Sequence, residues 1–368
     1  MAIVPQYLVE AEGFDIYPVG AISTTNYPWT VTNSAYTGTV TGSAGAFGGN
    51  GLVFASQATN ATGLNVNFPS TMSILRSGGN SAVLCWSGWV TFGSPSSQVQ
   101  DALIALASST GSTSNGYNLF GVSNSSATGL LLCFPSNLNN LFSSPYTFSI
   151  EPSTYYWVSI CFAFTAGAVT ATYQVNGVSI QSNVSLSWTA DGFSSGMIAN
   201  QIRFGCSRMF AWTLDDMVIQ GVSSSDASWP GGTVQPSLVP QPQPRKIQNA
   251  VAVSNGPIIQ WSVSGSEPNW QSATDPTGAN SVIATDVNQT DLYNWTATGA
   301  TGIMGIVLKG TTTRYANVTP QRYIASTQSA FPLVTYGPQR VIGISENDGT
   351  NGWTAASIAA ASFGQESH

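Results

Sequence analysis

The chain has 368 residues and a formal net charge of −7, and only 7% of its residues are charged. Its nine Lys and Arg residues are dispersed, so the clustered basic surface that nucleic-acid binding requires is not predicted. No apolar run of about 18 residues is present, so we predict no membrane-spanning helix. The length is too great for one ordinary core, which favours two domains.

Uncharged polar residues, mainly Ser, Thr, Asn, Gln and Gly, take the place of the missing charged residues. These residues suit strands and turns, whereas exposed helices favour Glu, Lys, Ala and Leu. Residues 1–12 lack a basic segment followed by an apolar core, so we expect no signal peptide and folding in a cytoplasm. The segment 42–52 is rich in glycine, which permits tight turns between short strands.

Short runs of β-branched and aromatic residues follow at intervals typical of a β-sandwich. They lie at 81–92, 101–107, 117–122, 130–134, 201–206 and 214–220. No helical periodicity is evident in this half of the chain. The spacing predicts roughly ten to fourteen strands before residue 222 and an all-β, jelly-roll sandwich.

The stretch 155–180 contains the strongest strand signal. Residues 155–164 are dense in aromatic and β-branched residues, and the small residues 165–168 predict a turn. Apolar and polar residues then alternate over 169–175, as in a strand with one buried face. Asn176 and Gly177 predict a type I′ turn, because both central residues of that turn need positive φ. A third strand is expected to begin at Val178.

Between residues 223 and 251 the composition shifts to Ser, Gly and then Pro. Prolines at this density disfavour sheet and helix and favour extended polyproline II backbone. We therefore predict a semi-rigid linker at 223–251, between a jelly-roll domain at 1–222 and a small β-rich domain at 252–368. The alternative is a long surface loop within one domain.

The C-terminal part contains candidate strands at 258–263, 281–285, 303–308, 321–326, 331–336 and 340–344. Residues 353–361 predict one short helix with Thr354 as its N-cap, or else an edge strand. No repeat links the two halves of the chain, so an internal duplication is not predicted.

Four cysteines, Cys85, Cys133, Cys161 and Cys206, lie within strand-like runs. None belongs to a Cys-x-x-Cys motif, and no secretory signal is expected. We therefore predict four buried free thiols, with one disulfide pair as the alternative.

The residue types of nucleophilic and zinc catalysis are scarce. The single histidine, His368, is the last residue, where nothing holds an imidazole in the orientation that a catalytic triad needs. The cysteine spacing does not match a four-Cys zinc site, and no nucleophile-elbow or phosphate-loop motif is present. The sequence therefore predicts a protein that is not an enzyme.

Two acidic groups come nearest to the carboxylate pair of a glycoside hydrolase. Glu10, Glu12 and Asp15 lie close together near the N-terminus, with no second carboxylate strand nearby in the sequence. Asp215 and Asp216 are adjacent, so on a regular strand their side chains point to opposite faces. We interpret the glutamates as a surface pair, and Asp215 and Asp216 as strand-edge residues that bond loop backbone.

Calcium is a candidate bound ion, although no EF-hand spacing occurs. Oxygen-bearing side chains near predicted loops are the candidate ligands: Asp215, Asp216, Asn118 and Asn176. Tryptophans beside turn residues could stack on a sugar, and these are Trp29, Trp188, Trp229 and Trp270. We select Trp188 and Trp229 as the candidate carbohydrate-binding residues and expect the tryptophans in strand-like runs to pack in the core.

The order of several short motifs resembles that of the concanavalin A-like or laminin-G-like jelly-roll domains in tailed-bacteriophage virion proteins. In the N-terminal half these motifs are residues 13–17, 45–52, 156–158, 173–177, 202–205 and 214–218. The C-terminal part is similar to the small domain that follows in such proteins, at Trp261, Asn269, 291–293 and 352–354.

This resemblance implies a non-enzymatic virion protein, on the capsid exterior or on the tail and its fibres, that folds in the host cytoplasm. The expected partners are further copies in a symmetric oligomer and neighbouring virion proteins. The low charge agrees with a surface that packs against other subunits. A carbohydrate-binding module that recognises a host surface glycan is the alternative, and a polysaccharide depolymerase is the third hypothesis.

Overall fold

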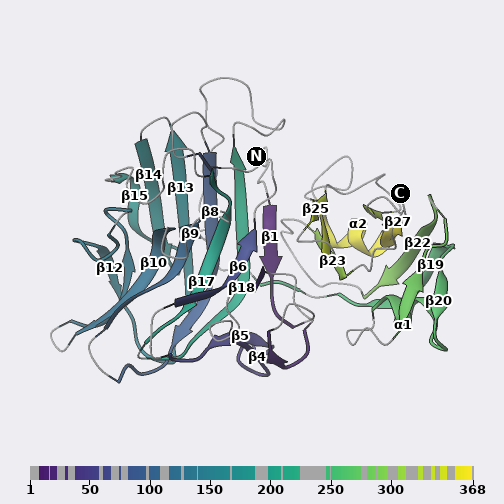
Figure 1. The fold of residues 1–368 in the computed structure, drawn as a ribbon, viewed down its shortest axis with the longest axis horizontal. Helices are drawn as coiled ribbons and strands as arrows, with labels where there is room; N and C mark the ends of the chain where they lie inside the picture. The colour runs from purple at the N-terminus through teal and green to yellow at the C-terminus, as the bar shows by residue number, and fades with distance from the viewer. Residues whose placement is uncertain are drawn as a thin grey trace. The chain divides into compact units, whose positions relative to one another are not determined.

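The computed structural model divides the chain into two compact units, residues 1–247 and residues 248–368. Both units consist of antiparallel strands, with two short helices among the described residues of the second, so the predicted all-β fold is confirmed (Figure 1). None of the described helices is long and apolar enough to cross a membrane. The described residues are 8–15, 17–22, 30–31, 38–57, 61–67, 74–75, 82–96, 99–107, 116–125, 128–138, 140–165, 168–186, 198–208, 210–223, 246–248, 250–274, 280–286, 288–296, 306–311, 322–325, 333–335, 340–345 and 353–366.

Unit 1 is a jelly-roll sandwich with two large sheets. The strand order of the nine-stranded sheet is β15-β14-β13-β8-β18-β5-β4-β2, and β1 also pairs with β18. Its strands are β1 (Leu8–Glu12), β2 (Gly20–Ala21), β4 (Thr39–Thr41), β5 (Gly51–Phe54), β8 (Ala82–Phe92), β13 (Tyr156–Thr165), β14 (Ala168–Val175), β15 (Val178–Leu186) and β18 (Trp212–Ser223).

The second large sheet of unit 1 has seven strands in the order β12-β11-β10-β9-β17-β6-β3. They are β3 (Thr30–Val31), β6 (Ala61–Asn67), β9 (Val99–Ala107), β10 (Gly116–Ser125), β11 (Gly129–Phe134), β12 (Tyr146–Ser149) and β17 (Gln201–Cys206). A separate two-stranded sheet pairs β7 (Ile74–Leu75) with β16 (Ile198–Ala199).

Aromatic side chains fill the space between the two large sheets. Trp86 of β8 stacks on Phe120 of β10, with ring centroids 6.3 Å apart. Phe134 of β11 stacks in the same way on Tyr173 of β14, at 5.0 Å. All four side chains are at most 1% exposed. Because each large aromatic ring buries roughly 150–250 Å², these pairs hold the sheets together.

The meander formed by β13, β14 and β15, next to β8 in the sheet, has the geometry that the sequence predicts. Asn176 and Gly177 have φ angles of 50° and 79°, as a type I′ turn requires. Buried and partly buried residues alternate along β14. β15 is longer than expected and extends to Leu186, because its pairing with β14 continues past two register shifts, one on each side of Tyr173.

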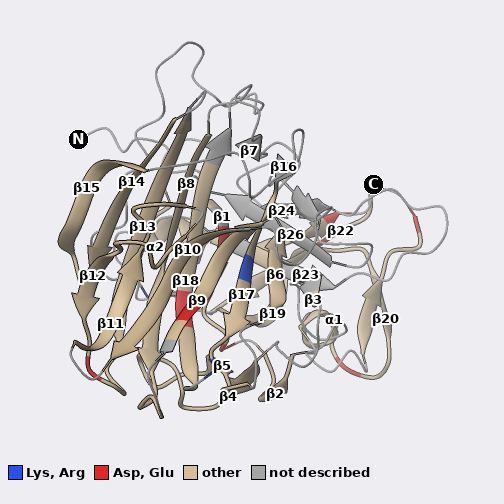
Figure 2. Ribbon diagram, turned by 60° about the vertical axis from the view of Figure 1, so that its left-hand side comes forward, with Lys and Arg blue, Asp and Glu red and all other residues tan. Residues whose placement is uncertain are grey.

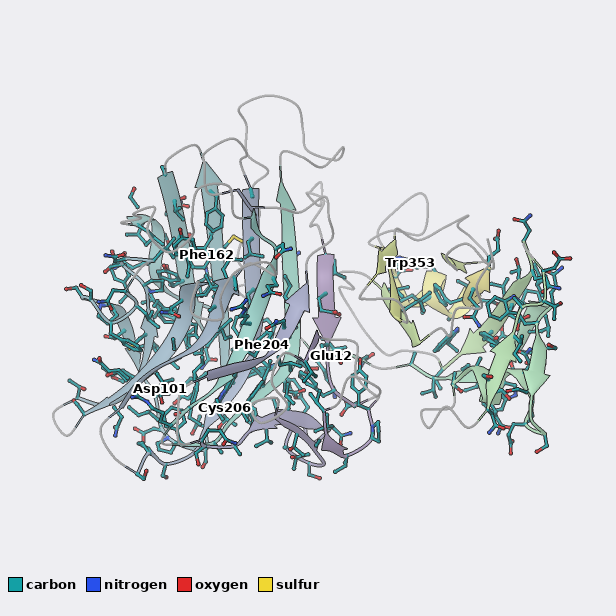
Figure 3. The ribbon with its side chains drawn as sticks, viewed as in Figure 1. Glu12, Asp101, Phe162, Phe204, Cys206 and Trp353 are labelled. Atoms are coloured by element: carbon teal, nitrogen blue, oxygen red, sulfur yellow. A yellow bond between two sulfur atoms is a disulfide. The ribbon has the colours of Figure 1, made fainter. Side chains whose placement is uncertain are left out.

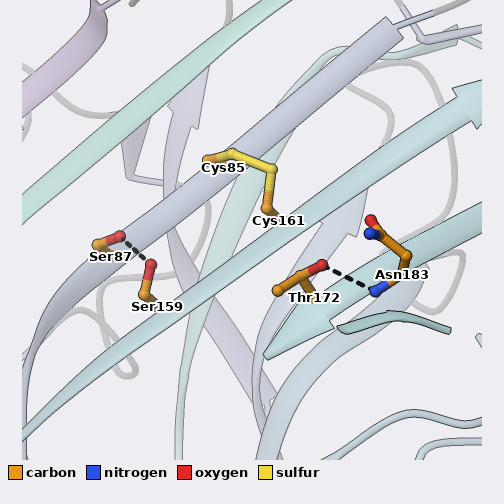
Figure 4. Close-up of a disulfide and its surroundings, with 6 residues drawn as sticks. All are labelled: Cys85, Ser87, Ser159, Cys161, Thr172 and Asn183. Atoms are coloured by element: carbon orange, nitrogen blue, oxygen red, sulfur yellow. Dashed lines mark hydrogen bonds between the residues drawn. A yellow bond between two sulfur atoms is a disulfide. The ribbon is translucent and has the colours of Figure 1, made fainter. Parts of the chain in front are cut away.

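Cys85 and Cys161 form a disulfide, so the prediction of four free thiols is wrong. The two residues are direct partners in the pairing of β8 with β13, beside a bonded pair of serines (Figure 4). They lie 76 positions apart in the chain, and only the sheet makes them neighbours. Cys133 and Cys206 are buried thiols outside the disulfide, and burial raises the pKa of these thiols to about 12 and about 11.

Unit 2 contains three small sheets among its described residues. Their orders are β19-β22-β27-β24, β20-β21 and β23-β26-β25. The elements are β19 (Ala252–Ile259), β20 (Ser262–Ser264), α1 (Asn269–Ala273), β21 (Ser281–Ile283), β22 (Thr290–Trp295), β23 (Ile306–Thr311), β24 (Arg322–Ala325), β25 (Leu333–Thr335), β26 (Arg340–Ser345), α2 (Ala355–Ala360) and β27 (Phe363–Glu366). One core cluster packs Leu308, Trp353, Ala361 and Phe363 together.

The predicted C-terminal helix is present as α2. Thr354 is its N-cap, and Thr354 and Ser357 form a capping box, each side chain bonding the other residue's backbone N–H. β22, β27 and α1 were not predicted from the sequence. The strands β22 and β27 carry acidic, amide and small residues in place of the β-branched runs that mark strands. Their local sequence favours a strand only weakly, and pairing with neighbouring strands decides their structure.

Candidate functional site: an acidic cluster on the last strand of unit 1

The last strand of unit 1, β18, changes neighbours partway along one edge. Residues 212–214 pair with β5, whereas residues 217–220 pair with β1. Asp215 and Asp216 lie at the gap between these partners, where the register with β8 also shifts. Asp216 has a φ of 44°, in the left-handed region. Such a bulge breaks the regular alternation of side chains. The expectation that the two aspartate side chains point to opposite faces of the strand therefore does not hold at this position.

Asp215 holds the glycine-rich loop that connects β4 to β5. Its Oδ2 accepts a hydrogen bond of 2.7 Å from the backbone N–H of Ala46. Gly45 leaves no room for a side chain, since a Cβ there would lie 2.8 Å from the same carboxylate oxygen and 2.9 Å from the Asn50 carbonyl. Asp215 is 4% exposed, and no described group donates a hydrogen bond to its Oδ1.

Asp216 holds the two residues that follow the Pro-rich stretch. Its Oδ1 accepts a hydrogen bond of 3.0 Å from the backbone N–H of Ile247. The adjacent Lys246 places its Nζ 5.1 Å from the centroid of the Phe47 ring. Gly13 packs closely here, since a Cβ on it would lie 3.0 Å from Asp216 Oδ1 and 3.1 Å from Ile247 Cβ.

β1 and the turn after it add two further carboxylates. Glu12, at the end of β1 (Figure 3), accepts hydrogen bonds from Phe14 N at 3.0 Å and from the Tyr17 hydroxyl at 2.9 Å. Asp15 Oδ1 accepts one from Asn50 N at 2.5 Å. The turn is therefore tied to the same glycine-rich loop that Asp215 holds.

Burial raises the pKa values of the two aspartates on β18, and neighbouring carboxylates add to the shift. Burial raises the pKa of Asp215 to about 6; repulsion from Asp15 and Glu12 adds to the effect, and backbone hydrogen bonds oppose it. Burial, then repulsion from Asp215, raises the pKa of Asp216 to about 8, although Lys246 and the hydrogen bond from the backbone oppose the shift. At neutral pH the Asp216 carboxyl therefore holds its proton.

Aromatic side chains flank the cluster. Trp89 on β8 is the register partner of both Asp215 and Trp157. The Phe47 ring meets Trp89 edge-on at 5.6 Å, and Trp89 meets Trp157 at 5.7 Å. Phe47 is 50% exposed, whereas Trp157 is fully buried. Phe47 therefore has half of its side chain at the surface, with the Lys246 Nζ over its ring.

The cluster does not fit a calcium ion. Both oxygens of Glu12, and one oxygen each of Asp215 and Asp216, already accept hydrogen bonds from N–H or O–H groups, which a cation would have to displace. Among the described residues, no group of three or more acidic, His or Cys side chains can hold a metal. The other predicted ligands lie elsewhere: Asn118 is in β10 of the other sheet, and Asn176 bonds the backbone of β13.

The structure places the sequence-predicted site residues differently from the prediction. Trp188 and Trp229 lie outside the described residues. Glu10 and Glu12 are 0% and 1% exposed, so their interpretation as a surface pair is wrong. The second carboxylate strand is not nearby in the chain, because β1 pairs with β18 from the other end of unit 1. The glycines at 45–51 were the available signal, because they indicate close backbone packing around a buried group.

The geometry supports cohesion and not catalysis. A general acid or a nucleophile must reach its substrate, but Glu12, Asp215 and Asp216 are at most 4% exposed. Their hydrogen bonds join β1, its following turn, the glycine-rich loop, β18 and the Lys246–Ile247 segment. The chemical change open to this cluster is therefore the gain or loss of protons.

No protein-family model matches the chain, and no curated protein matches it. Among solved structures it is similar to Trypanosoma rangeli sialidase in complex with the inhibitor DANA, at 12% identity and a TM-score of 0.28, over 47% of this chain and 25% of that one. It is also similar to the binding domain of Paraclostridial mosquitocidal protein 1, at 12% identity and a TM-score of 0.34, over 58% and 48%. It is likewise similar to peanut lectin with a 9mer peptide, at 10% identity and a TM-score of 0.32, over 55% of this chain and 95% of that one. The chain thus spans a quarter of the sialidase and about half of the toxin domain, and these likenesses carry no argument about function.

Proposed function

We propose that this chain is a non-enzymatic structural protein of a tailed-phage virion, with its lectin-like jelly roll facing outward. The placement of its charges carries this proposal. Of the eleven acidic residues that the structure describes, six are buried: Glu10, Glu12, Asp101, Asp215, Asp216 and Asp291. Charged segments are few and scattered over the described ribbon (Figure 2). A soluble monomer normally keeps a mixed, charged surface, so this charge-poor chain favours contact with neighbouring subunits.

The edge of the nine-stranded sheet supports assembly. β15 is nine residues long, lies at that edge and contains neither a charged residue nor a proline. Natural edge strands are usually short, charged, interrupted by proline or covered, because an open edge pairs with other chains. Two register shifts, one on each side of Tyr173, interrupt the pairing of β15 with β14. We propose that further copies of the chain, or neighbouring virion proteins, cover this edge after folding in the host cytoplasm.

Sedimentation of the full chain tests the assembly. We expect a closed oligomer at micromolar concentration that Ser182→Lys, at an exposed position of β15, dissociates. Ser143→Lys, at an exposed loop position of the same unit, is the matched control and should leave the oligomer intact. Antibody labelling of purified particles should then place the chain on head or tail. A chain that remains monomeric and is missing from particles contradicts the proposal.

Glycan binding in host attachment is the second candidate, and the exposed ring of Phe47 favours it. An aromatic face packs against the apolar side of a sugar ring. A glycan array, run with and without a chelator, should show saturable binding that Phe47→Ala weakens, and the same array tests Trp188→Ala and Trp229→Ala. Absence of binding to every glycan contradicts this role. Release of reducing ends from a host polysaccharide would instead indicate a depolymerase, and we expect none.

A further inference from the structure

We propose that Cys161 is a site of thiol–disulfide exchange, at which a small thiol such as glutathione opens the disulfide of unit 1 and a small disulfide closes it again. Cys85 is then the resolving cysteine, whose thiol is released on opening and attacks Cys161 on closure. The two cysteines form the disulfide between β8 and β13. This modification site belongs to unit 1 alone and is independent of the virion role and of glycan binding.

Both sulfur atoms lie outside the core of the sandwich. Trp86 on β8 packs against Phe120 of the opposite large sheet. Because side chains alternate along a strand, the preceding residue, Cys85, points to the outer face of the nine-stranded sheet. Cys161 is its direct register partner on β13 and faces the same way. A reagent that approaches this outer face therefore reaches the disulfide without entering the core.

The disulfide is closed on its Cys85 side. Cys85 is 1% exposed, and its neighbours on the same face of β8, Val83 and Ser87, are buried as well. Its register partner on β18, Gln220, is also buried. The rate of thiol–disulfide exchange depends on access to the sulfur that is attacked. These surroundings therefore disfavour attack on the sulfur of Cys85.

The Cys161 side of the disulfide is more open, toward β14. Cys161 is 7% exposed. Ala163, two positions along β13 on the same face, has a small side chain that is only partly buried. Thr172, the direct register partner of Cys161 on β14 (Figure 4), is likewise only partly buried. Cys161 therefore provides the accessible end of the disulfide.

Non-covalent contacts keep the two cysteines together when the bond is open. Ser87 and Ser159, two positions away on the same strands, are buried and bond each other at 2.8 Å. Beyond them, the rings of Trp89 and Trp157 meet at 5.7 Å. Such cross-strand pairs fix the register of β8 with β13 without the disulfide. The two thiols of the reduced chain therefore stay side by side, and one can displace a glutathione that is bound to the other.

Opening takes two exchange steps. A glutathione thiolate attacks the Cys161 sulfur, the S–S bond of the protein breaks, and Cys85 leaves as a thiolate. A second glutathione thiolate attacks the glutathione sulfur of this mixed disulfide and releases Cys161 together with oxidised glutathione. The two glutathione molecules supply the two electrons, and the two cysteines take up the two protons that the glutathione thiols gave up. Closure is the reverse sequence, with oxidised glutathione as the oxidant.

Cys133 and Cys206 provide an internal comparison. They are buried on β11 and β17 of the other large sheet. Burial raises the pKa of their thiols to about 12 and about 11, so the thiolate that reacts is scarce at neutral pH. We expect neither cysteine to react while unit 1 is folded.

Peptide mass spectrometry of the full chain identifies the sulfur that is attacked. The unaltered protein is treated with reduced glutathione and quenched with iodoacetamide, which alkylates the released thiol and leaves the mixed disulfide in place. We expect glutathione on Cys161 and the alkyl group on Cys85. This measurement uses no variant, so it does not depend on whether a variant folds.

Two serine variants test the same asymmetry in the direction of closure. Both lack the disulfide, so each controls for its loss in the other. The reduced Cys85→Ser chain, treated with oxidised glutathione, should accumulate a glutathione adduct at Cys161. In Cys161→Ser the adduct at Cys85 should form about sevenfold more slowly, which is the ratio of the two exposed fractions, 7% and 1%.

A bulkier residue beside Cys161 tests the path of approach. Ala163→Leu, introduced into the Cys85→Ser chain, extends over the open side of the sulfur and should slow the formation of the adduct severalfold. Ala168→Leu in the same chain, at an exposed position of β14, is the matched control and should leave the rate unchanged. Equal rates in the two leucine variants would contradict an approach from the β14 side.

Two further results would overturn the assignment of the site. Glutathione found on Cys85 of the unaltered chain, or equal rates in the two serine variants, would show that Cys161 is not the attacked sulfur. Modification of Cys133 and Cys206 as fast as that of Cys161 would show that glutathione reacts only with the unfolded chain.

Discussion

Two buried acidic sites, Asp291 in unit 2 and the Asp215–Asp216 pair in unit 1, differ in how their charge is compensated. In unit 2, Asp291 of β22 accepts four hydrogen bonds. Its Oδ1 accepts from the backbone N–H groups of Gln260 and Trp261 at 2.6 and 2.8 Å, and its Oδ2 accepts from the side chains of Asn269 and Tyr293, both at 3.0 Å. A buried carboxylate with four donors is compensated by hydrogen bonds alone.

In unit 1, Asp215 and Asp216 accept fewer hydrogen bonds and repel each other. Each takes one from a residue distant in the chain, Ala46 and Ile247 respectively, and Asp215 Oδ1 has no donor among the described residues. Asp291, Asp215 and Asp216 are buried to a similar degree. The two sites therefore differ in the number of hydrogen-bond donors and in the distance to other acidic side chains. The comparison shows that Asp291 is a fixed structural anchor, whereas the acidic cluster of unit 1 depends on protons.

Asp291→Ala should have the largest effect of the substitutions that test this comparison. It leaves four donors without their acceptor, two of them backbone groups, and we expect a loss of about 4 kcal/mol in the stability of unit 2. Differential scanning calorimetry should show the unit 2 transition falling while the unit 1 transition stays in place. Asp286→Ala, an exposed acid of the same unit, is the control. A loss below about 1 kcal/mol would mean that the donors find other partners.

Loss of the disulfide should affect unit 1 alone. Replacement of Cys85 and Cys161 by alanine removes a link between positions 76 residues apart, and we expect a loss of about 3 kcal/mol in the stability of unit 1. Calorimetry of the double variant should show no change in the unit 2 transition. Added reductant should lower the unit 1 transition of the unaltered chain but not that of the double variant. An equal response of both would show that the disulfide contributes nothing.

The stability of unit 1 should fall as the pH rises from 5 to 8. The pKa values of Asp215 and Asp216, about 6 and about 8 in the folded chain, exceed the value of about 3.9 expected in the unfolded chain. The folded state therefore binds more protons over this range, and its unfolding free energy should fall by roughly 5 kcal/mol. Asp216→Asn should remove most of this slope in calorimetry at pH 5, 6.5 and 8. Stability of unit 1 that increases with pH would contradict the assignment.

Thr354→Ala should have the smallest effect. It removes the side chain that caps α2, together with half of the capping box, and we expect a loss of about 1 kcal/mol from unit 2. Thr354→Ser keeps the capping hydroxyl and should restore nearly all of that stability. Urea unfolding, followed by the fluorescence of Trp353 at the same helix end, measures the change. Equal stabilities of the alanine and serine variants would show that the cap does not matter.

Local features of this protein could be predicted from the sequence. The alternation over 169–175, the turn at Asn176 and Gly177 and the N-cap at Thr354 all appear in the structure. Each depends on backbone preferences and side-chain contacts within a few residues, which the chain carries wherever the segment lies. The scarcity of charge in the sequence likewise indicated strands and turns, and the fold is all-β.

Tertiary structure alone decided the disulfide and the two acidic sites. Cys85 meets Cys161 because β8 pairs with β13, and Asp215 meets Ala46 across 169 positions because β5 and β1 share one edge of β18. Asp291 lies on a strand that the sequence analysis missed. Which strands become neighbours is set by the packing of the whole sandwich, so residues with unremarkable local sequence acquire their partners only when the sheets form.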